Sequence, residues 1–86
     1  MADNKVSLEV VVNGSPTQVE ANVNQPLHAI KGKALDQTGN AAGQPPENWE
    51  FRDAPGAVID ESKKIGELGL TDGSRVFLNL KAGVGG

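Results

Sequence analysis

Residues 6–21, which read VSLEVVVNGSPTQVEA, decide the fold of this chain. Every second residue from Val6 to Val12 is apolar, so these side chains share one face of a strand whose other face meets water. The segment Asn13-Gly14-Ser15-Pro16 supplies a turn in which Gly14 is free to take a positive φ. A second alternating run ends at Ala21, and the whole stretch therefore predicts a β-hairpin.

The apolar spacing changes from that of a strand to that of a helix after residue 23. The helical stripe consists of Leu27, Ile30, Ala34 and Leu35. Asn24 or Gln25 is placed to cap the start of this helix, and Gly39 is placed to end it in the left-handed conformation. We therefore expect one amphipathic helix directly after the hairpin.

Two more strands are predicted in the second half of the chain. Residues 38–48 are too rich in Gly, Pro and Asn for regular structure, and a short strand follows that points Trp49 and Phe51 inward. The plug segment, residues 58–70, carries apolar side chains in irregular backbone, and a final strand alternates from Val76 to Leu80. A helix on one face of a mixed sheet buries all these stripes, with the first and last strands as parallel central neighbours. The prediction is an α+β fold of the β-grasp type.

Composition limits the function of a chain this small. The 86 residues form one domain without cysteine, which excludes disulfides, thiolate catalysis and cysteine-ligated metals. The single histidine, His28, excludes a His-rich metal site, and the small core offers no evident nucleophile–base pair. A net charge of −3 argues against a nucleic-acid or anionic-membrane surface. The chain has no signal-peptide core or bilayer-spanning run, so we expect a cytosolic monomer that is not an enzyme and holds no metal or cofactor.

The chain resembles ubiquitin and its relatives over nearly its whole length, and three stretches carry the resemblance. Gly43-Gln44-Pro45-Pro46 resembles the Gly-x-Pro-Pro connector after the ubiquitin helix. Residues 56–61 and the plug residues Ile65, Leu68 and Leu70 resemble the turn and plug before its last strand. Residues 74–81, followed by Gly85-Gly86 at the end, resemble its last strand and diglycine tail. The chain is most similar to the bacterial ubiquitin-like modifiers, some of which act in phage defence.

This resemblance implies a chemical role for Gly85 and Gly86. An activating enzyme would adenylate the Gly86 carboxylate with MgATP, and the acyl group would pass to enzyme cysteines and then to a target lysine as an isopeptide bond. Glycine suits both positions because no Cβ blocks a narrow channel or the acyl carbon. We expect a domain over residues 1–81 and a flexible tail over residues 82–86. The implied partners are an activating enzyme, a conjugating enzyme, a deconjugating protease and target lysines.

Lys31 lies within the apolar arc of the predicted helix. Its amine either extends along the rim to solvent or, as the resemblance implies, is buried in an ion pair with Glu61. The second arrangement would make Lys31 a poor acceptor for self-conjugation.

The outer sheet face and the tail are the predicted docking surface. Its outward residues are Phe77 and Asn79 on the last strand and Glu50 and Arg52 on the third, in a register that is open by two residues. The resemblance extends the surface into the tail through Lys81, Ala82, Gly83 and Val84. Because ubiquitin is apolar where this face carries charge, we expect weak binding by receptors for ubiquitin itself.

Two other functions remain open. A sulfur carrier of the thiamin or molybdopterin type shares the fold, the diglycine and the adenylation, but ends as a thiocarboxylate. A non-covalent ubiquitin-like adaptor would not use its glycine tail. The Pro-Pro connector and the plug segment favour the ubiquitin-like modifier.

Overall fold

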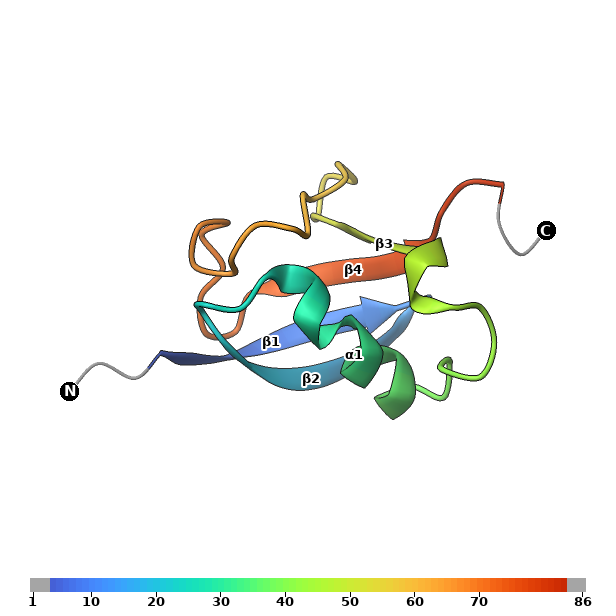
Figure 1. Cartoon of the computed structure of the whole chain (residues 1–86), viewed down its shortest axis with the longest axis horizontal. Helices are drawn as coiled ribbons and strands as arrows, with labels where there is room; N and C mark the ends of the chain where they lie inside the picture. Colours follow the sequence, from blue (N-terminus) through green and yellow to red (C-terminus); the bar gives the residue numbers. More distant parts are fainter. Residues whose placement is uncertain (1–3, 84–86) are drawn as a thin grey trace.

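The computed structural model describes residues 4–83 and shows a helix packed across a four-stranded sheet (Figure 1). The elements in chain order are β1 (Lys5–Val12), β2 (Ser15–Asn22), the 3-10 helix η1 (Leu27–Ile30), α1 (Lys31–Gln37), the 3-10 helix η2 (Pro46–Asn48), β3 (Trp49–Arg52) and β4 (Arg75–Leu80). The short helix η2 lies in the connector, where the sequence predicted no regular structure.

The hairpin of β1 and β2 forms as its alternation predicts. Asn13 and Gly14 both have positive φ, 49° and 88°, which matches the backbone twist of a two-residue hairpin turn. This turn pairs Val12 with Ser15 and sets the register of the whole hairpin. The even-numbered side chains of β1 consequently face the helix.

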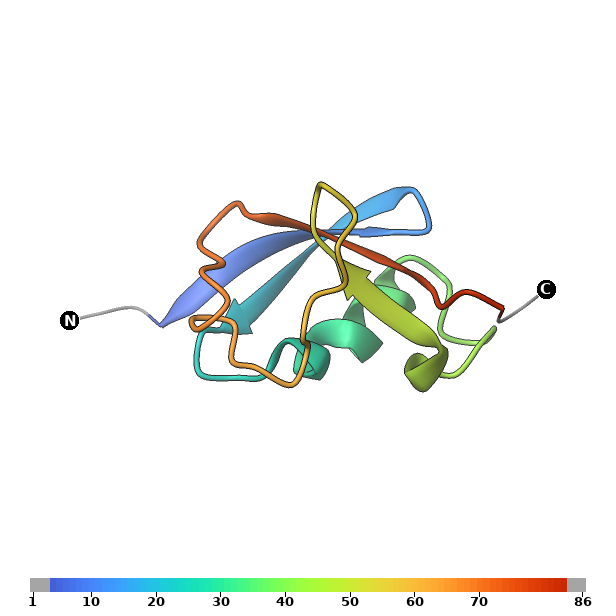
Figure 2. The ribbon, with the colours of Figure 1, turned by 90° about the horizontal axis from the view of Figure 1, so that it is seen from above.

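The sheet order is β2-β1-β4-β3, and β1 pairs in parallel with β4 at the centre. β3 joins the edge antiparallel to β4, with Arg52 opposite Phe77 and Glu50 opposite Asn79. Figure 2 shows the sheet and the helix as two layers. The predicted β-grasp fold is confirmed, and this register removes the two-residue uncertainty for the third strand.

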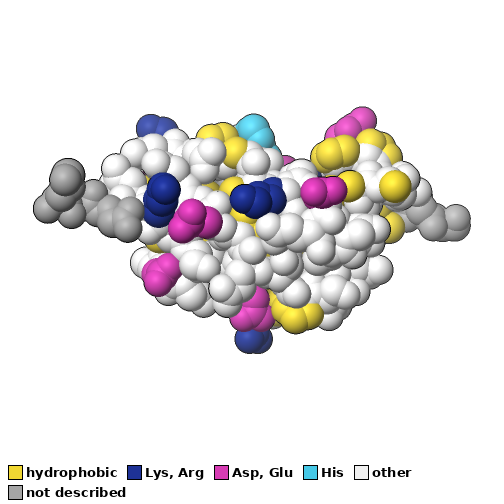
Figure 3. Space-filling model, turned by 90° about the horizontal axis from the view of Figure 1, so that it is seen from below, with side chains coloured by type: hydrophobic (Ala, Val, Ile, Leu, Met, Phe, Trp, Pro, Cys, Tyr) yellow, Lys and Arg dark blue, Asp and Glu magenta, His cyan; other side chains and the backbone are white. Residues whose placement is uncertain are grey.

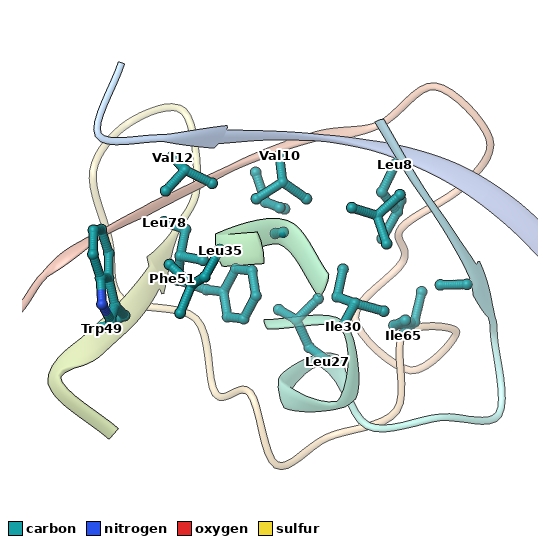
Figure 4. Close-up of a cluster of buried hydrophobic side chains, with 14 residues drawn as sticks. Leu8, Val10, Val12, Leu27, Ile30, Leu35, Trp49, Phe51, Ile65 and Leu78 are labelled. Atoms are coloured by element: carbon teal, nitrogen blue, oxygen red, sulfur yellow. The ribbon is translucent and has the colours of Figure 1, made fainter. Parts of the chain in front are cut away.

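The core lies between the inner face of the sheet and the helical segment (Figure 4). Its labelled side chains are Leu8, Val10, Val12, Leu27, Ile30, Leu35, Trp49, Phe51, Ile65 and Leu78. Trp49 lies at one end of the cluster and Ile65 at the other. Each fully buried aliphatic or aromatic side chain contributes about 1.5–3 kcal/mol, so this layer supplies most of the driving force for folding.

The helix ends as predicted but begins differently. At its end, Gly39 has a φ of 76°, and the Asn40 amide donates to the Leu35 carbonyl in a Schellman motif. At its start, no side chain caps η1, so the predicted cap at Asn24 or Gln25 is wrong. The Leu27 and His28 amides instead donate to the carbonyls of Lys63 and Glu61, each at 3.0 Å. The plug segment therefore satisfies the first helical N–H groups.

Charges of both signs are interspersed on the surface seen in Figure 3, and that face carries no patch of a single sign. Within residues 4–83, no helix is long and apolar enough to cross a bilayer.

Candidate functional site

The tail leaves the domain at the end of β4 that lies beside the start of β3. Leu80 pairs with Trp49, and the Lys81 amide donates to the Asn48 carbonyl at 2.8 Å. Ala82 and Gly83 follow this bond and are exposed. Val84, Gly85 and Gly86 lie outside the described residues, so their predicted roles stay predictions.

Asn48, whose carbonyl accepts the Lys81 amide where the tail leaves the domain, is itself held by hydrogen bonds. The Asn48 amide donates to the Pro45 carbonyl at 2.9 Å, and its side-chain amide donates to Gln44 Oε1 at 2.9 Å. Trp49 is buried beside it, and its indole N–H donates to the Gln44 carbonyl at 3.3 Å. The carbonyl that receives the Lys81 amide is therefore part of the packed fold. The sequence alone does not predict these bonds, although the Pro-Pro connector and the adjacent Trp49 mark the place where they form.

Lys31 is buried, with 6% of its surface exposed. Its Nζ lies 2.5 Å from Glu61 Oε1 and donates to the carbonyls of Trp49 at 2.8 Å and Pro46 at 3.2 Å. The amine also lies 5.9 Å from the centre of the Phe51 ring. An ammonium group has three protons to donate, and all three have acceptors here. Lys31 thus joins the helix to the connector, to β3 and to the plug segment.

Glu61 reaches Lys31 because the plug segment is bonded to the start of the helix. The bond from the His28 amide to the Glu61 carbonyl positions the backbone of Glu61 beside the first turn. Its side chain is 26% exposed, so the pair is buried on the lysine side and partly hydrated on the carboxylate side. The Lys31 amine is consequently inaccessible to an incoming acyl group.

The outer face of the sheet carries one row of side chains from edge to edge. Strand pairing aligns Pro16 with Val11, Val11 with Phe77, and Phe77 with Arg52. Directly paired residues point to the same face of a sheet, so three apolar side chains adjoin one arginine. Phe77 and Val11 are half-buried in this row. The sequence placed Phe77 here but did not identify Val11 or Pro16, although the hairpin register carries that information.

The charges at the edge of this row are paired with each other. Arg52 Nη2 lies 2.5 Å from Glu50 Oε2, and Arg52 Nη1 donates to the Gly56 carbonyl at 2.6 Å. Arg52 and Glu50 are therefore not isolated charges, and the expected weak binding by receptors for ubiquitin stays a prediction. Because Glu50 neutralises Arg52, a partner that covers the row meets a neutral edge beside Phe77.

The described residues offer few side chains that could bind a metal ion or act in catalysis. Among residues 4–83 no three His, Asp or Glu side chains gather in a way that could hold a metal ion. His28 is exposed on η1. What the arrangement presents is an anchored strand end, an exposed continuation of the chain and a neutral, partly apolar sheet face.

Comparisons with known proteins place the chain in a family. The model of the family described as "Protein of Unknown function (DUF2604)" matches residues 1–86, so the chain belongs to this family. It is 57% identical over 82 residues to "Uncharacterized protein y4jI" of Sinorhizobium fredii (strain NBRC 101917 / NGR234). That match covers 95% of this chain and 62% of the relative, so the chain spans less than two thirds of the relative's length.

Solved structures show the same fold at low identity. The ubiquitin of Caldiarchaeum subterraneum has a TM-score of 0.72 and 22% identity, covering 95% of this chain and 99% of that one. A de novo design based on ubiquitin has a TM-score of 0.77 and 17% identity, covering 99% of each chain. The fold is therefore ubiquitin-like.

Proposed function

We propose that this member of the DUF2604 family is a ubiquitin-like protein modifier that is joined to target lysines through Gly86. The observation that carries the proposal is the end of β4. The bond from Lys81 to Asn48 anchors the strand, and Ala82 and Gly83 continue it in exposed backbone toward the two terminal glycines. This arrangement suits an acyl donor whose reacting carbon must enter another protein's channel.

The proposed chemistry has three balanced steps on a free Gly86 carboxylate. The carboxylate attacks the α-phosphorus of MgATP on the activating enzyme, which gives an acyl-adenylate and pyrophosphate. An enzyme thiolate then displaces AMP and forms a thioester. A target amine displaces the thiol, loses a proton and forms the isopeptide bond. In this scheme the present chain supplies the acyl group, and its partners supply the catalytic groups.

The neutral row of Pro16, Val11, Phe77 and Arg52 is the proposed docking surface, with Asn79 and Glu50 in the adjoining row. One of its strands, β4, continues directly into the tail, so one enzyme surface can contact both. We propose that the protein acts as a cytosolic monomer and that a protease reverses the linkage after Gly86. A role in phage defence is the context that the bacterial resemblance suggests.

The test uses purified protein, MgATP and an extract of the native host. We expect an adduct that hydroxylamine releases, together with larger species on denaturing gels whose digested peptides carry the tail on lysine. Deletion of Gly85 and Gly86 should abolish both. Gly32→Ala is the matched control, because it changes a glycine of α1 where a Cβ meets no atom within 4 Å.

The same experiment separates the alternatives. Replacement of one carboxylate oxygen by sulfur, seen in the intact mass without larger species, would establish a sulfur carrier. An unchanged mass, with host phenotypes that survive deletion of the diglycine, would contradict the modifier and favour an adaptor. The intact mass of protein isolated from the host also reports whether its Gly86 carboxylate is free.

A further inference from the structure

A cavity of about 310 Å³ opens at the start of β4, between this strand and the segment that connects it to β3. The apolar part of its lining consists of Val58, Ile59, Leu68, Leu70 and Val76. Val76 is buried, and Ile59, Leu68 and Leu70 pack partly buried against the core. The floor of the cavity is therefore held in place by the hydrophobic core.

Val58 lies at the edge of this cavity and is 57% exposed. Among residues 4–83 it is the large hydrophobic residue that is exposed to solvent. It is held in position by an antiparallel bridge to Arg52, and the next amide, from Ile59, donates to the Phe51 carbonyl at 2.9 Å. A single exposed valine is ordinary on a protein surface. Val58 differs in that it continues the apolar part of the cavity's lining out to the surface.

The polar lining of the cavity is acidic in effect. Arg75 is its one cation, and Arg75 Nε lies 3.1 Å from Glu9 Oε2, which neutralises it. Asp53 Oδ1 accepts the Ala57 amide at 2.8 Å. Since an ionised carboxylate offers about four acceptor positions, Asp53 keeps capacity for a further donor.

Asp60 is the second acidic group of the lining. Its Oδ1 accepts the Ser62 hydroxyl at 2.5 Å and the Ser62 amide at 3.1 Å. These two bonds, the hydroxyl first, together with the charge of Lys63, lower the pKa of the Asp60 carboxyl below its ordinary value of 3.8. Asp60 is therefore ionised at neutral pH.

We propose that this cavity is a docking site for an extended segment of a partner protein that carries an aliphatic or aromatic side chain next to a lysine or arginine. The volume is at the lower limit for ligand pockets, about 300–1,000 Å³, and suits one large side chain. The neighbouring cation would meet Asp53 and Asp60. The site does not depend on the proposed function, because β4 runs about 3.3 Å per residue and separates the cavity from the tail by about 20 Å.

Selection from a library of short random peptides displayed on phage tests this site. The bait is the full 86-residue chain, and Val58→Asp is used only afterwards, to measure the affinity of the enriched peptides. We expect enriched peptides to contain an apolar residue beside lysine or arginine. Synthetic versions should bind Val58→Asp about tenfold more weakly, because that change puts a charge against the apolar contact. Ala29→Asp adds the same charge at an exposed position of η1 and should leave the affinity unchanged.

A double variant, Asp53→Asn with Asp60→Asn, tests the electrostatic part while keeping side-chain size. It should weaken the same peptides by about threefold, the effect of losing exposed ion pairs. Binding to a chain without residues 82–86 should be unchanged, which separates this site from the tail. Absence of any enriched sequence, enriched sequences without a basic residue, or equal binding to folded Val58→Asp would each overturn the proposal.

Discussion

Lys31 contacts β3 from the inner face of the sheet, whereas Arg52 belongs to β3 and points to the outer face. Each of these two cations binds one carboxylate and at least one backbone carbonyl. Lys31 lies on the inner face with Glu61 and the Trp49 carbonyl, and its side chain is 7% exposed. Arg52 lies on the outer face with Glu50 and the Gly56 carbonyl, and its side chain is 36% exposed. The two sites share their chemistry and differ in burial.

This difference assigns the two cations different roles. Removing one partner of a buried ion pair costs about 3–5 kcal/mol, because the remaining polar groups are left without water. An exposed pair contributes about 0.2–1 kcal/mol, and the part-buried pair of Arg52 and Glu50, whose side chains are 36% and 14% exposed, lies between these two limits. Lys31 is therefore part of what holds the connector and plug segment to the helix. Arg52, whose side chain is 36% exposed, contributes less to stability than Lys31.

The first and largest test of this contrast is Lys31→Ala. We expect it to lower the free energy of unfolding by about 3 kcal/mol, since the Trp49 and Pro46 carbonyls lose their donor in a buried site. Urea unfolding at neutral pH measures the change. Lys33→Ala, at an exposed position of the same helix, is the control and should change stability by less than about 0.5 kcal/mol. Equal effects of the two substitutions would remove the contrast.

A smaller loss is expected for Glu61→Gln. The amide oxygen of glutamine still accepts a hydrogen bond from Lys31, but the negative charge that neutralises the ammonium is gone. We therefore expect the free energy of unfolding to fall by about 1.5 kcal/mol. The same unfolding measurement, with exposed Glu20→Gln on β2 as its control, reports the difference. If Glu61→Gln is as stable as the unmodified chain, the lysine is held by the two carbonyls alone.

For Arg52→Ala on the outer face, we expect a loss of stability of about 1 kcal/mol, because the Glu50 carboxylate, whose side chain is 14% exposed, loses its partner. Its effect should appear in recognition, because the Arg52 side chain borders Phe77 and the alanine exposes more of the ring. The readout is the hydroxylamine-sensitive adduct in host extract with MgATP that the proposed function predicts, and Arg75→Ala, which breaks the exposed pair with Glu9, is the control. A loss of stability as large as that of Lys31→Ala would show that burial does not determine how much each cation contributes to stability.

The smallest effect concerns a carboxylate without a buried partner. Because the folded state lowers the pKa of Asp60, its contribution is present above pH 3.8, the ordinary value, and is lost as the pH falls through the lower folded value. Asp60→Asn and Ser62→Ala should each reduce stability slightly at pH 7, and the difference should vanish in acid. NMR titration of the carboxyl carbon gives the pKa directly, and a value at or above 3.8 would contradict the assignment.

Much of this fold was predictable because its signals are local. The alternation of β1 and the helical spacing from Leu27 to Leu35 each reflect the geometry of a single element. The pairing of Lys31 with Glu61 was predictable only through the resemblance to ubiquitin, since thirty residues of chain separate the two side chains. The charge-bearing residues of the outer face were identified, but their neutralisation by Glu50 and the Gly56 carbonyl was not.

The sequence by itself determined the number and type of the main elements, the apolar face of each and the presence of a glycine tail. Tertiary structure decided which groups meet: the Asn48 carbonyl that anchors Lys81, the row that brings Pro16 beside Phe77, and the cavity below Val58. The physical reason is that side-chain periodicity follows from backbone geometry within one element. Contacts between elements depend on strand register and on where loop carbonyls lie once the core has packed.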